Sequence, residues 1–82
     1  MKSQIFYNAI YQRNKIRFLY GMEQIVMEPY FVTTDKTGSK VIYGRPDSSK
    51  QIRKFEFGRI ANIKVLNTYK FSPIIPIMSM VN

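Results

Sequence analysis

With 82 residues, a net charge of +8 and neither cysteine nor histidine, the chain is long enough for one small domain. The missing cysteines exclude disulfides, thiolate nucleophiles and zinc knuckles, and the missing histidine removes the commonest general base near neutral pH. No apolar run approaches the roughly 18 residues of a membrane span, and none follows Lys2 in the manner of a signal peptide, so we expect a cytoplasmic protein with no membrane partner.

A helix is predicted over about residues 3–13, because apolar side chains recur on one face of that segment. Ser3 is the expected N-cap, since its hydroxyl can accept a hydrogen bond from the first turn. The apolar stripe consists of Ile5, Phe6, Ala9 and Ile10. A stripe at this spacing predicts a helix that docks one face onto a core.

A hairpin is predicted next, from strands over about residues 15–20 and 23–32. Gly21-Met22 suits a two-residue turn with glycine first. Pro29 cannot donate to a ladder, so the second strand should bend or reach an edge there. The turn predicts five cross-strand pairs. They are Tyr20 with Glu23, Phe18 with Ile25, Ile16 with Met27, Arg17 with Val26, and Lys15 with Glu28.

Three more strands are predicted, over about residues 40–44, 51–57 and 59–66. Arg53, Phe55 and Phe57 should share one face of the fourth strand, and Gly58 marks a bulge or a sharp bend after it. One helix followed by five short antiparallel strands indicates a mainly-β fold, a five-stranded Sm-like or SH3-like small barrel.

We assign residues 1–70 to this single domain and residues 71–82 to an apolar C-terminal arm. Pro73 and Pro76 exclude a helix through the arm, although most of its other residues are apolar. Because exposed apolar runs are penalised, we expect the arm to pack on the domain or on a second subunit. The alternatives are a disordered tail and a chain that continues further.

Four segments of the chain resemble segments of a WYL domain, and they follow one another in the same order and at the same spacing. The resemblance covers about residues 5–68. The segments are residues 9–20, 28–32, 38–44 and 53–66, of which the pattern R-x-F-x-[F/L]-x-R-I from Arg53 is the most specific. The resemblance implies a helix followed by an Sm-like barrel that senses nucleic acid or nucleotide ligands in bacterial transcription regulation. It places functional weight on the strand around residues 40–45, on Arg53 and on Arg59. We expect a stand-alone bacterial or phage version, without the helix-turn-helix of most members.

The candidate site residues are basic or aromatic, because guanidinium groups match phosphate oxygens and aromatic rings stack on bases. They are Arg17, Tyr20, Lys40, Tyr43, Arg45, Arg53, Lys54 and Arg59, with Phe55 as a further stacking platform. The alternative for the aromatic residues is a place in the core. For the arginines it is a solvated face or an ion pair with Glu28, Asp47 or Glu56.

The sequence therefore predicts a regulatory binding module for single-stranded DNA or RNA, or for a nucleotide. The 13 lysines and arginines against 5 acidic residues favour such polyanions, although a basic surface also arises in lysine-rich proteomes. No acidic pair, phosphate loop or nucleophile constellation is present, so we expect no catalysis, cofactor or metal. The alternative function is a protein-interaction or homo-oligomerisation module that uses residues 71–82. A third hypothesis is a phage or mobile-element protein that captures a signalling nucleotide or a host factor.

Overall fold

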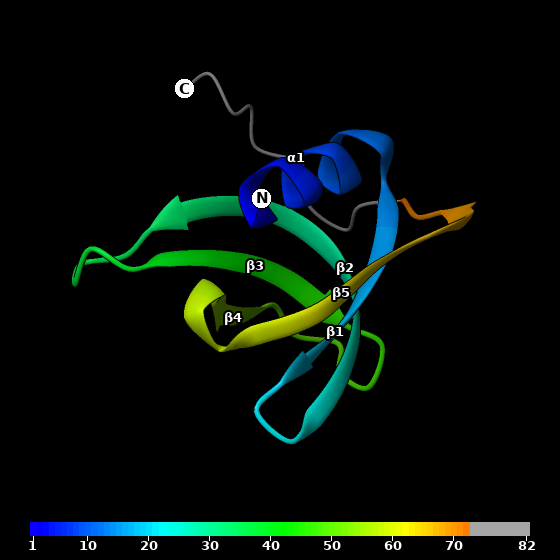
Figure 1. The fold of residues 1–82 in the computed structure, drawn as a ribbon. Coiled ribbons are helices and arrows are strands. Elements are labelled where there is room, and N and C mark those ends of the chain that lie inside the picture. Colours follow the sequence, from blue (N-terminus) through cyan, green and yellow to red (C-terminus); the bar gives the residue numbers. More distant parts are fainter. Residues whose placement is uncertain (73–82) are drawn as a thin grey trace.

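The computed structural model describes residues 1–72, apart from the side chains of Thr68 and Tyr69. One helix is followed by five antiparallel strands in a single sheet of order β4-β3-β2-β1-β5 (Figure 1). The elements are α1 (Lys2–Gln12), β1 (Asn14–Tyr20), β2 (Glu23–Thr34), β3 (Lys40–Pro46), β4 (Arg53–Glu56), the 3-10 turn η1 (Phe57–Arg59) and β5 (Ile60–Lys70). The sheet is strongly curved, and α1 covers one end of it. Within the described residues its edge strands, β4 and β5, are not paired with each other.

The hairpin register is the predicted one. Ile16 lies opposite Met27, Phe18 opposite Ile25 and Tyr20 opposite Glu23, and Gly21 takes the positive φ of 62° that the tight turn needs. The predicted meeting of Lys15 with Glu28 does not produce an ion pair. Lys15 binds the carboxylate of Asp47 at 3.1 Å, and Glu28 binds Arg45 at 3.2 Å.

Two irregularities bend the sheet. The register of β2 against β3 shifts between Pro29 and Phe31, so Tyr30 is an extra residue in β2 at the predicted proline bend. The register of β5 against β1 shifts between Arg17 and Leu19, where Asn62 has φ 55°. Asparagine tolerates this left-handed conformation better than most residues do, so β5 can turn sharply there.

The core lies between α1 and the concave face of the sheet. Phe6, Ala9 and Ile10 are buried against it, as the helical stripe predicts, and Ile5 is partly buried. From the sheet, Phe18 and Phe55 are almost fully buried, with their rings edge to face and 5.2 Å apart. For Phe55, the predicted alternative to a stacking platform, a place in the core, is therefore confirmed.

Three predicted details are wrong. Ser3 is not the N-cap, because the helix begins at Lys2 and Met1 precedes it without a capping side chain. The fourth strand is shorter than predicted, since β4 ends at Glu56 and the chain then enters η1. Phe57 consequently leaves the face shared by Arg53 and Phe55. It packs instead edge to face with Phe6 in α1, with ring centres 5.1 Å apart.

The chain after β5 returns to the domain at Phe71. Its backbone N–H donates to the carbonyl of Arg13 at 3.0 Å, and its buried ring meets Tyr30 edge to face. The rest of the predicted apolar arm, residues 73–82, lies outside the described residues. Among residues 1–72, no helix has the length and apolar character required to cross a bilayer.

Candidate functional site

Two predicted binding residues, Arg53 and Arg59, come together over the ring of a third, Tyr20. The guanidinium carbon of Arg59 lies 4.5 Å from the centre of the Tyr20 ring, and that of Arg53 lies 5.9 Å from it. Arg53 also lies over Phe55, at 4.6 Å. Both arginines are exposed, whereas the two rings beneath them are buried. We call Tyr20, Arg53, Phe55 and Arg59 the arginine cluster.

Three elements position the cluster. Tyr20 ends β1, and its hydroxyl accepts a hydrogen bond from the backbone N–H of Glu56 at 3.1 Å, which ties β1 to the end of β4. Arg53 precedes Phe55 by two residues in β4, so both side chains lie on the concave face. The η1 turn then brings Arg59 back toward the β1–β2 turn, where its Nη2 would lie 3.7 Å from a Cβ added at Gly21.

One carboxylate borders the cluster. Glu23 Oε1 lies 3.4 Å from Nη2 of Arg53, with side chains that are 56% and 43% exposed. Such an exposed pair contributes about 1 kcal/mol or less, because water and salt screen it. A phosphate that binds both arginines can therefore displace Glu23 from Arg53.

The cluster has the chemistry of an anion site. Guanidinium groups donate in a planar fork that matches phosphate oxygens, and their faces stack on bases. The role predicted for Phe55 as an open stacking platform is wrong, because its ring is 0% exposed. Tyr20 is only 9% exposed, so its ring supports the two guanidinium groups and offers little surface to a base. The exposed guanidinium groups are the part of the cluster on which a base can stack.

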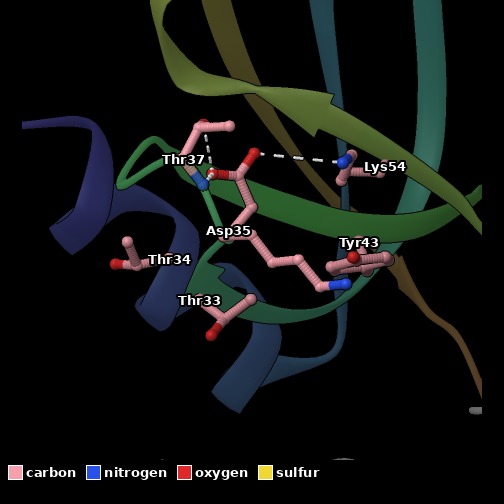
Figure 2. A pocket seen from close by; sticks show the side chains of 7 residues that line it. Thr33, Thr34, Asp35, Thr37, Tyr43 and Lys54 are labelled. Carbon is pink, nitrogen blue, oxygen red and sulfur yellow. Dashed lines mark hydrogen bonds and ion pairs between the residues drawn. The ribbon is translucent and has the colours of Figure 1, made fainter.

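Two further predicted residues, Tyr43 and Lys54, meet on the convex face of the sheet. They are cross-strand neighbours on β3 and β4, and they line an open pocket of about 370 Å³ with Thr33, Thr34 and Lys36 of β2 and the loop after it. Figure 2 shows Tyr43 and Lys54 on one side of this pocket and Thr37 on the other, with Asp35 between them. The Tyr43 ring is half-buried and stacks on Phe31, with ring centres 4.7 Å apart.

Asp35 organises the loop that borders this pocket. Its Oδ1 accepts hydrogen bonds from the hydroxyl and the N–H of Thr37, at 2.7 and 2.9 Å, and from the N–H of Ser39 at 3.1 Å. Its Oδ2 lies 3.9 Å from Nζ of Lys54. The Thr37 hydroxyl is the main cause that lowers the pKa of Asp35 below its ordinary value; both N–H groups and Lys54 act in the same direction, and burial opposes them.

Replacing Thr37 by valine is expected to raise the pKa of Asp35 toward its ordinary value, because the largest stabilising hydrogen bond is lost. A carboxyl group whose pKa is lowered by folding stabilises the fold above its unfolded pKa, and this contribution disappears as the pH falls through the folded pKa. An NMR titration of the Asp35 carboxyl carbon measures the shift. Thr34→Val is the matched control, and an equal midpoint in both variants contradicts the assignment.

The other three predicted residues lie elsewhere. Arg17 is on the convex face of β1, opposite Lys64 of β5. Lys40 donates to the hydroxyl of Ser3 at 3.3 Å, beside the helix. Arg45 is paired with the buried carboxylate of Glu28.

Arg45 belongs to a structural network. The Tyr30 hydroxyl donates to Glu28 Oε1 at 2.7 Å, and both Glu28 oxygens accept from the guanidinium group of Arg45. Tyr30 and then Glu28 are the main causes that raise the pKa of Arg45 above its ordinary value. For Arg45, the predicted alternative to ligand binding, an ion pair with Glu28, is therefore confirmed.

Sequence reasoning missed the neighbours that complete these sites, Glu23 at the arginine cluster and Asp35 with Thr37 at the pocket. The signal for Glu23 was the hairpin register, which places it opposite Tyr20. The signal for the loop was the short spacing of Asp35, Thr37 and Ser39, since aspartate side chains bind backbone N–H groups two residues on.

Comparisons with protein-family models, curated proteins and solved structures gave no match. Within residues 1–72, no group of three or more histidine, cysteine, aspartate or glutamate side chains is arranged to hold a metal ion. The candidate function therefore depends on the charge and geometry of the arginine cluster and its surroundings.

Proposed function

We propose that this protein is a regulatory module of the WYL type that binds single-stranded nucleic acid or a nucleotide at the arginine cluster. The observation that carries the proposal is the pair of exposed guanidinium groups, Arg53 and Arg59, held over one buried tyrosine ring. A net charge of +8 supports it, because a basic surface attracts polyanions over a distance.

The fold proposed for this module is a small Sm-like or SH3-like barrel. Its support is the strong curvature of the sheet and the short η1 turn, which links the edge strands β4 and β5 (Figure 1). The bond from the Glu56 N–H to the Tyr20 hydroxyl adds a tie between β4 and β1. In such a barrel the arginine cluster lies at one open end, where a ligand phosphate can reach both guanidinium groups.

The proposal predicts binding that depends steeply on salt. Each phosphate contact with a single strand contributes a slope of about −0.7 to the logarithm of affinity against the logarithm of salt, so about four contacts weaken binding roughly 50-fold between about 50 and 200 mM salt. Fluorescence anisotropy of a labelled oligothymidylate measures this change, with thymidine monophosphate as a competitor for the nucleotide case. Absence of binding of both ligands at the lower salt concentration contradicts the proposal.

A further inference from the structure

The edge strand β4 presents cations to both faces of the sheet. Arg53 lies on the concave face with the arginine cluster, and Lys54, the next residue, lies on the convex face beside the pocket. Residues 51–54 are all exposed, so the beginning of β4 is open to solvent at both of these cations. The arginine cluster and the pocket are thus separated by a single exposed strand.

The pocket offers groups that suit a second nucleotide. Tyr43 is held by its stack on Phe31, with the two ring planes 16° apart, and its cross-strand neighbour is the 46% exposed side chain of Lys54. A ring already fixed in place loses little entropy when a base stacks on it, and an ammonium group beside it can reach the adjoining phosphate. Thr33 and Thr34 line the same space, and threonine hydroxyl groups can donate to phosphate or sugar oxygens.

The carboxylate in this pocket does not oppose an anionic ligand strongly. Asp35 Oδ1 already accepts three hydrogen bonds, and Oδ2 faces Lys54. Lys36 and Lys54 both line the pocket with Asp35, which leaves one excess positive charge among the lining residues. A phosphate near Lys54 therefore meets a site of net positive charge.

We propose that one nucleic-acid strand crosses the edge of the sheet at β4, with a phosphate at the arginine cluster and a further nucleotide in the Tyr43–Lys54 pocket. This inference rests on the proposed function and deepens it, because it makes the ligand an oligonucleotide of several residues. Small OB-fold domains, which bind single strands in a similar way, cover about 4 to 16 nucleotides. A mononucleotide occupies the arginine cluster alone.

The test compares thymidine monophosphate with a labelled oligothymidylate of about twelve nucleotides, a length within the range that small single-strand binders cover. Lys54→Gln and Tyr43→Leu are each expected to weaken the oligonucleotide by about five- to tenfold, since one phosphate contact or one stacked base is lost. Both variants should bind the monophosphate as the wild type does. Lys64→Gln on β5 is the charge-matched control. It should bind the monophosphate as tightly as Lys54→Gln does, and it should bind the oligonucleotide more tightly than Lys54→Gln does.

NMR of the wild-type protein gives a second readout that needs no substitution. The oligonucleotide should shift the backbone amide signals of Tyr43 and Thr34, which line the pocket and are not neighbours of Arg53 or Arg59 in sequence. The monophosphate should leave these two signals in place and shift those around Arg53 and Arg59. If the oligonucleotide leaves the pocket signals in place and Lys54→Gln binds it as tightly as the wild type, the crossing strand is refuted while the arginine cluster stands. If Arg53→Gln also binds both ligands as the wild type does, the proposed function fails as well.

Discussion

Replacing both Arg53 and Arg59 by glutamine is expected to weaken single-strand binding about 100-fold at about 50 mM salt, because each charge-assisted contact is worth roughly a factor of ten. The two guanidinium groups lie over the same Tyr20 ring, so one phosphate or two adjacent ones can contact both. The magnitude of the salt slope should decrease by about 0.7 if the two arginines share one phosphate, and by about 1.4 if they contact two. Anisotropy titrations at several salt concentrations measure both quantities.

A double variant of equal charge provides the control. Arg17 and Lys64 lie opposite each other on β1 and β5, on the convex face. Arg17→Gln with Lys64→Gln also removes two positive charges, but from the face of the sheet opposite to the Tyr20 ring. This variant should lose only the few-fold affinity that follows from a lower net charge. Equal losses in the two double variants would show that binding depends on overall charge and has no defined site.

Much of the concave side of this fold can be predicted from local patterns. The register of the β1–β2 hairpin follows from a two-residue turn and from alternating apolar side chains, since a slip by one residue would expose Phe18 and Ile25. The docking face of α1 follows from helical spacing for the same reason. In both cases a single local period decides which side chains are buried.

The ion pairs and hydrogen bonds between residues far apart in the sequence are less predictable. The hairpin register predicts that Lys15 meets Glu28, but Lys15 pairs with Asp47, and Glu28 is buried beside Arg45 and Tyr30. The Tyr30 hydroxyl donates to Glu28 next to the bulge after Pro29. The bend at Pro29 is predictable, whereas the partners that Glu28 finds there come from two different strands. The sequence pattern alone predicts Arg45 as a binding residue, whereas the structure places it in an ion pair with Glu28.

The arginine cluster can be predicted from the sequence only in part. Alternation along β4 places Arg53 with Phe55, which the sequence pattern shows directly. The approach of Arg59 to Tyr20 requires the η1 turn, a three-residue departure from the strand that a continuous alternating pattern does not contain. A glycine at position 58 indicates that the strand is interrupted, but it does not determine the direction in which the chain turns.

The bend that aligns β4 with this site depends on the absence of a side chain at Gly44. This residue is buried in β3, opposite Pro29 of β2 on one side and Arg53 of β4 on the other. A Cβ at this position would lie 2.5 Å from the backbone carbonyl oxygen of Glu28 and 2.5 Å from the sulfur of Met27. The methionine side chain can move, whereas the carbonyl belongs to the ladder between β2 and β3, so the two strands must separate.

Gly44→Ala is accordingly expected to lower the free energy of unfolding by about 3 kcal/mol, at the upper end of overpacking costs. For a domain of this length that corresponds to a fall in Tm of roughly 12 to 24 °C. Thermal unfolding followed by circular dichroism measures it. Gly58→Ala is the matched control, since a Cβ there meets nothing within 4 Å and the residue has no positive φ. Its free energy of unfolding should change by less than about 1 kcal/mol.

Equal stability of the two alanine variants would mean that β2 and β3 can separate at Gly44 without loss, and the close approach of the two strands would then not shape the sheet. If instead only Gly44→Ala is destabilised, oligonucleotide binding at a temperature where it remains folded becomes informative. Gly44 pairs directly with Arg53, so a displaced β3 should move Arg53 away from the Tyr20 ring. Affinity should then fall even though no charged group has been removed, which connects the curvature of the sheet to the geometry of the arginine cluster.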